Sequence, residues 1–110
     1  MPRRVRGIVS SNSTVTLAAR ETNVSRNNFN SDYGVHKTLL LTNASTTIHT
    51  NIKVVLENSN SDQIILYAVK IPPTVTLLLN EGLNFNNSEY ALKLIVTGVS
   101  GTPSIHYNLD

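Results

Sequence analysis

The sequence contains no cysteine in its 110 residues. This absence excludes a disulfide framework, a thiolate metal site and a cysteine nucleophile. Charged residues make up 15% of the chain and aromatic residues 5%, whereas soluble domains usually contain about 25% charged residues. No apolar run approaches the roughly 18 residues of a spanning helix, and no apolar segment of a signal peptide follows the arginine-rich start. We therefore expect neither a membrane segment nor a signal peptide.

Small polar residues take the place of charge. The chain has 14 asparagines, 11 serines and 12 threonines, against 40% hydrophobic residues. This balance lies far from the composition of disordered chains and is typical of β-proteins with a polar surface. The length fits one domain with one core.

The charge is unevenly distributed along the chain, whose net charge is +2. Met1–Lys37 holds six basic and two acidic residues, and Thr38–Asp110 holds three basic and five acidic residues. A basic arm on an acidic body can bind nucleic acid, or it can attach a subunit to an acidic neighbour. Because the arm has no interleaved aromatic residues for base stacking, we expect a protein partner rather than nucleic acid.

Alternating apolar residues predict short strands over Arg4–Val9 and Thr14–Ala19, followed by an Asn/Ser-rich loop. We therefore divide this single domain into a basic N-terminal arm, residues 1–34, and a body, residues 35–110. In the body, extended segments are predicted over His36–Thr42, Ile48–Glu57, Ile64–Val69, Thr74–Leu79, Leu83–Phe85, Glu89–Thr97 and Ser104–Leu109. Strands at this spacing without a helix indicate an all-β fold, either an antiparallel β-sandwich or a jelly-roll-like barrel with an extended arm. The strand order stays open.

The residues available for catalysis are few. The histidines His36, His49 and His106 are too far apart in sequence to form a local metal motif, and no hydrolase or phosphate-loop motif is present. Strands can still bring histidines together, but unrelated surface positions are the simpler interpretation. We expect a protein that is not an enzyme and that needs no cofactor or metal.

Several predicted strands are apolar on both faces, namely Leu39–Leu41, Ile64–Val69 and Leu77–Leu79. We expect the strand at Ile64–Val69 to be covered on both sides. More apolar strand surface than one small core can bury indicates a subunit of an assembly, including a homo-oligomer. The candidate interface residues are Arg3, Arg4, Arg6, Arg26, Ile71, Pro72 and Leu78. A separate hypothesis is a host-glycan-binding module, for which Phe29 and Tyr33 are the candidate contacts.

Three motifs carry a resemblance over Leu41–Val96. They are the turn LTNAS at residues 41–45, the corner IPPTVTLLL at residues 71–79 and the segment NFNNSEYALK at residues 84–93. This segment resembles small virion structural proteins of tailed bacteriophages, of the type found in marine cyanobacterial phages. The resemblance implies a β-sandwich without active-site residues, located in the virion and assembled in the host cytoplasm.

The resemblance also implies partners. Such a subunit either decorates or cements the capsid exterior by binding the major capsid protein, or it belongs to the neck, tail or baseplate. We take the decoration role as the leading hypothesis, with the basic arm and an apolar sheet face as the means of attachment.

Overall fold

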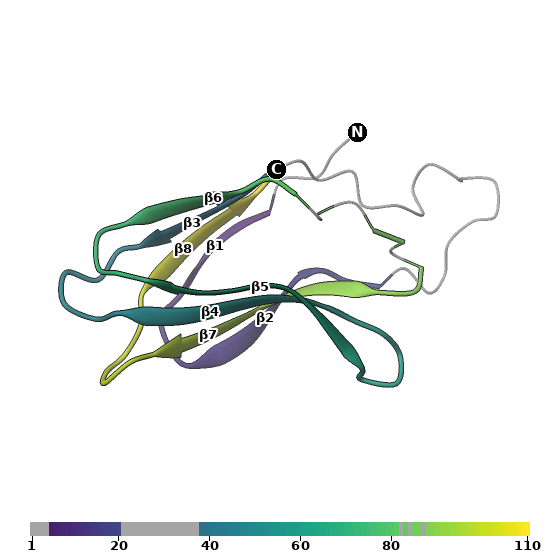
Figure 1. Ribbon diagram of the computed structural model, residues 1–110, viewed down its shortest axis with the longest axis horizontal. Helices are drawn as coiled ribbons and strands as arrows, with labels where there is room; N and C mark the ends of the chain where they lie inside the picture. The colour runs from purple at the N-terminus through teal and green to yellow at the C-terminus, as the bar shows by residue number, and fades with distance from the viewer. Residues whose placement is uncertain (1–4, 21–37, 82, 84, 87) are drawn as a thin grey trace.

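The computed structural model describes residues 5–20, 38–81, 83, 85, 86 and 88–110. Within these residues, eight strands form two antiparallel four-stranded sheets that pack face to face (Figure 1). The all-β class and the sandwich architecture predicted from the sequence are confirmed.

The strands alternate between the two sheets. In spatial order, the first sheet contains β1 (Val5–Val9), β8 (Ile105–Leu109), β3 (Leu39–Asn43) and β6 (Thr76–Leu79). The second sheet contains β2 (Ser13–Ala18), β7 (Ala91–Gly98), β4 (Thr50–Glu57) and β5 (Gln63–Ile71). Apart from the β4–β5 hairpin, every described connection between successive strands crosses from one sheet to the other. This strand order is that of a jelly roll.

Period-two alternation builds the core. On β4, Ile52, Val54 and Leu56 point inward and are 1%, 0% and 7% exposed. Leu92 and Leu94 on β7 are fully buried beside them. Successive strand residues face opposite sides, so Lys53 and Val55 lie on the outer face. Lys53 is exposed there, whereas Val55 is 0% exposed. The inward faces of the first sheet supply Val9, Leu39, Leu41, Leu79, Ile105 and Leu109 to the same core.

The two strands predicted in the N-terminal third are outer strands of the sandwich. β1 pairs with β8, where Val5 lies opposite Leu109, and β2 pairs with β7, where Val15 lies opposite Leu94. Residues 1–4 and 21–34 of the predicted arm lie outside the described residues.

The proline pair makes the predicted corner. β5 ends at Ile71, and the chain crosses to the first sheet through Pro72 and Pro73. Thr74 follows with a φ of 65°. Its backbone N–H lies between two carbonyl oxygens, that of Asn43 at 2.9 Å and that of Ser45 at 3.1 Å. The corner therefore attaches the start of β6 to the end of β3.

Candidate functional site

The outer face of the first sheet carries exposed aliphatic side chains, which we call the outer apolar patch: Ile8, Leu40 and Leu78. Leu40 on β3 lies directly opposite Leu78 on β6. Their side chains are 36% and 54% exposed, and that of Ile8 on β1 is 64% exposed. All three occupy outward positions because their strand neighbours point into the core.

Polar side chains continue this face. Arg6, Asn108, Leu40 and Leu78 form one cross-strand row. The Nε of Arg6 donates to Oδ1 of Asn108 at 3.1 Å. This bond fixes one guanidinium nitrogen and leaves the other donors available. The row therefore combines a cation at one end with apolar surface at the other.

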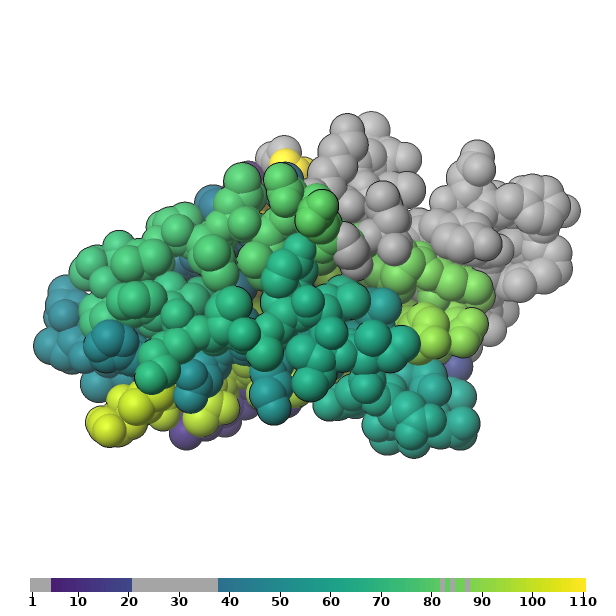
Figure 2. Space-filling model, in the orientation of Figure 1, coloured from purple at the N-terminus to yellow at the C-terminus, as the bar shows by residue number. Residues whose placement is uncertain are grey.

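The edge strand of the second sheet carries a separate apolar surface. Ile64 and Ile65 on β5 are 48% and 55% exposed. β5 lies at the sheet edge, on the side of the molecule that faces the viewer in Figure 2. The described chain therefore does not itself cover both faces of Ile64–Val69, because Ile64 and Ile65 at consecutive positions are both exposed. Coverage of this strand by a partner stays a prediction.

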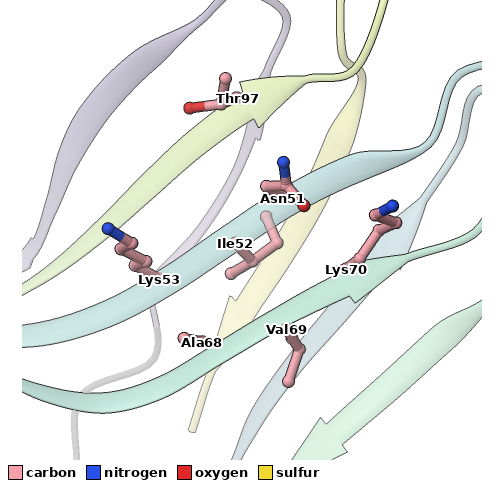
Figure 3. Close-up of a pocket in the computed structure, with 7 residues that line it drawn as sticks. All are labelled: Asn51, Ile52, Lys53, Ala68, Val69, Lys70 and Thr97. Carbon is pink, nitrogen blue, oxygen red and sulfur yellow. The ribbon is translucent and has the colours of Figure 1, made fainter.

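The second sheet has a shallow hollow of about 430 Å³ on its outer face. Outward residues of three strands form its rim: Asn51 and Lys53 from β4, Lys70 from β5 and Thr97 from β7. Ala68 on β5 lies opposite Lys53 and completes the lining (Figure 3). We call this the basic hollow.

An ion pair lies beyond the hollow on the same outer face. Nζ of Lys93 on β7 contacts Oε2 of Glu57 on β4 at 2.7 Å. Nε2 of Gln63 donates to the other carboxylate oxygen, Oε1, at 2.9 Å. The hydrogen bond from Lys93, followed by that from Gln63, holds the pKa of Glu57 below its ordinary value. This carboxylate is therefore already occupied by two donors.

The interface candidates have different places in the structure. Arg6, Pro72 and Leu78 are exposed. Ile71 is 1% exposed and packs in the core. It is therefore corrected to a core residue, because its inward position on β5 leaves no side-chain surface for a partner. The remaining candidates, Arg3, Arg4, Arg26, Phe29 and Tyr33, lie outside the described residues.

The described histidines do not form a metal site. His49 and His106 are exposed, and His36 lies outside the described residues. Within the described part of the chain, no group of three or more His, Cys, Asp or Glu residues is placed to hold a metal ion. The same part of the chain has no helix with the length and hydropathy needed to cross a lipid bilayer.

Sequence reasoning did not single out Leu40, Lys53 or Lys70. The alternation of strand residues could have identified Leu40. If Leu39 and Leu41 point inward, the residue between them points outward. The placement of Lys53 and Lys70 on one sheet face follows only from the β4–β5 register. The Asn58–Asp62 turn places the two strands in one hairpin and the lysines on one face.

Comparison with known proteins supports the fold. No protein-family model and no curated protein matches the sequence. The structure is similar to a mitogen from Yersinia pseudotuberculosis, with a TM-score of 0.51 and 10% identity, covering 99% of this chain and 86% of the mitogen. A sensory rhodopsin transducer from Anabaena matches with a TM-score of 0.43 and 10% identity, covering 98% of this chain and 96% of the transducer. The similarity to the mitogen, at 10% identity, shows a likeness of fold alone.

Proposed function

We propose that this protein is a non-enzymatic structural subunit of a tailed-phage virion, which decorates the capsid exterior by binding the major capsid protein. The outer apolar patch carries this proposal. Leu40 and Leu78 lie opposite each other on a sheet face that the described chain leaves uncovered. A face of this kind, with Arg6 at the end of the same row, fits a protein surface that offers aliphatic side chains beside a carboxylate.

The energetics favour attachment through such a face. Full burial of a leucine or isoleucine side chain contributes about 1.5–3 kcal/mol. Ile8, Leu40 and Leu78 each retain a third or more of that exposure, so covering all three contributes a few kcal/mol, on the order of two decades in affinity.

The virion assignment is supported by the sequence motifs. The LTNAS turn ends β3, and the IPPTVTLLL corner joins β5 to β6. These segments position β3 and β6, the two strands that carry Leu40 and Leu78. The segments that resemble phage virion proteins are therefore the ones that shape the proposed contact surface.

The decisive experiment compares two substitutions of matched exposure. Leu78→Asn removes an apolar side chain that is 54% exposed from the patch, and Ile65→Asn removes one that is 55% exposed from the β5 edge. We expect Leu78→Asn to lower the occupancy of assembled particles about tenfold, since roughly 1.4 kcal/mol of lost binding has that effect. Ile65→Asn should leave occupancy near wild type. Equal occupancy of both variants would contradict the proposal.

Copy number separates the capsid from other locations. Many copies per particle, distributed over the shell, are expected for a decoration subunit, and a few copies at one vertex would indicate the neck, tail or baseplate. The arm is tested with Arg3→Gln and Arg4→Gln, which remove two positive charges and change no residue of the described β1–β8 register. Reduced occupancy is expected if the arm binds an acidic neighbour.

A further inference from the structure

The basic hollow holds two lysines without a recorded partner. Lys70 lies opposite Asn51, and Ala68 lies opposite Lys53. The lysines are therefore diagonal neighbours, a spacing of about 7–8 Å between the two residues. Neither has a recorded ion pair or hydrogen bond with the residues that the structure describes. Two uncompensated positive charges flank one hollow.

Neutral donors lie between these charges. Asn51 and Thr97 are directly opposite each other on β4 and β7. Figure 3 shows the Asn51 side chain between those of Lys53 and Lys70. Its amide and the Thr97 hydroxyl each offer hydrogen-bond donors. Both residues are exposed, so these donors are accessible to a ligand.

Ala68 gives the hollow its space. It is the smallest side chain that lines the hollow, and it lies opposite Lys53 and two residues before Lys70 on β5. The resulting volume of about 430 Å³ falls within the roughly 300–1,000 Å³ of small-molecule sites. The space therefore accommodates an anionic group together with a substituent the size of a sugar ring.

We propose that the basic hollow binds the phosphate or sulfate group of a small ester such as a sugar phosphate. Lysine ammonium groups act as point charges that suit tetrahedral oxyanions, whereas the planar arginine fork suits carboxylates. The donors come from three strands, and Figure 3 shows the Lys53 and Lys70 side chains on either side of Asn51, with their ammonium groups extending to opposite sides. The rest of the ester lies over Ala68.

The binding test uses the full chain and two-dimensional NMR. Inorganic phosphate, added at pH 7 and constant ionic strength, should produce saturable shifts at Asn51, Lys53, Lys70 and Thr97. Lys53→Gln and Lys70→Gln should each raise the dissociation constant about tenfold or more, since each removes a charged hydrogen bond. Shifts that do not saturate, or that spread evenly over the molecule, would overturn the proposal.

Lys93→Gln is the matched control. It removes the same charge from the same sheet face, but Lys93 is already paired with Glu57. We expect it to change phosphate affinity by less than the two hollow variants do. An equal loss would mean that the phosphate responds only to the overall field of the face, and the site would be rejected.

Further ligands and one further variant identify the source of the anion. Glucose 6-phosphate should bind more tightly than inorganic phosphate or sulfate, and glucose alone should cause no shift. Ala68→Leu should weaken the sugar phosphate more than the free ion, because the added side chain fills the hollow. If Ala68→Leu affects both equally, the ester is rejected and a free-ion site remains.

This inference is independent of the proposed virion role. The basic hollow and the outer apolar patch lie on the outer faces of different sheets. Leu78→Asn should therefore leave phosphate binding unchanged, and Lys53→Gln should leave particle occupancy unchanged.

Discussion

The side-chain Nδ2 of Asn43 donates a hydrogen bond to the backbone carbonyl of Ile71 at 2.9 Å. The two residues are 28 positions apart, at the end of β3 and the end of β5. Asn43 is fully buried. Its Nδ2 also donates to the carbonyl of Ile48 at 2.8 Å, and its Oδ1 accepts from the N–H of Ser45 at 3.1 Å. One amide thus joins the LTNAS turn to the proline corner.

Asn43→Ala should destabilise the fold by about 3 kcal/mol, because it leaves buried carbonyls without a donor. Urea unfolding measures the loss. Asn51→Ala is the control, since that side chain is exposed and has no recorded hydrogen bond with the described residues; it should change stability by less than about 0.5 kcal/mol. Similar losses for the two variants would contradict the structural role of Asn43.

Gly98→Ala should cost about 1–3 kcal/mol of stability through overpacking. An added Cβ would collide with the backbone carbonyl oxygen of Gly101, which cannot rotate away. Gly101→Ala is the matched comparison, because its Cβ would meet the Cδ1 end of Ile48 at 2.5 Å, and that side chain can change rotamer. In thermal unfolding, the midpoint temperature of Gly98→Ala should lie well below that of Gly101→Ala. The reverse order would refute the packing described for this turn.

Thr74→Gly should stabilise the protein by up to about 1 kcal/mol. Thr74 has a φ of 65°, a conformation that costs an L-residue roughly 1–2 kcal/mol. Relief of this strain exceeds the entropy that glycine adds to the unfolded chain, which is about 0.5–1 kcal/mol. Thr102 is not among the residues with positive φ, so Thr102→Gly relieves no strain and should lower the stability of the fold. Denaturant midpoints for the pair should therefore move in opposite directions.

The Glu57–Lys93 pair should make stability depend on acid pH. The folded-state pKa of Glu57 is lowered from its ordinary value of 4.5, so its contribution is complete above that pH. The contribution is lost as the pH falls through the lowered folded value. Urea unfolding at a series of pH values should show that wild type and Glu57→Gln differ near pH 7 and converge in acid. A difference that stays constant with pH would exclude this linkage.

Local patterns predicted the strands but not their neighbours. Alternation placed Ile52, Val54 and Leu56 on the core face, where the structure has them. The same reasoning did not predict that Ile64 and Ile65 are exposed in the described chain. Apolar residues on both faces occur in central strands and also in edge strands that pair with another protein. Whether β5 is central or at an edge depends on which distant strands pair, and no short window of sequence contains that information.

The candidate surfaces could be predicted only in part, because they too depend on which distant strands pair. Leu78 was identified, whereas its cross-strand neighbour Leu40 was not, because their pairing joins β3 and β6 across the two strands between them in sequence. Ile71 was one of the interface candidates, and the structure places it in the core. Its burial follows from the β5 register and from the Asn43 hydrogen bond, both of which are tertiary features.

The pairing of Val5 with Leu109 has a mechanical consequence. The first and last strands of the sandwich are antiparallel neighbours, and Figure 1 shows their outer ends at the same end of the molecule. Tension applied to these two ends would act across the β1–β8 ladder and open its hydrogen bonds one pair at a time, as in a zipper, rather than shearing them together. When it is pulled by the ends of β1 and β8, the domain should therefore unfold at low force. A subunit that is attached through a sheet face bears no such tension across its β1–β8 ladder.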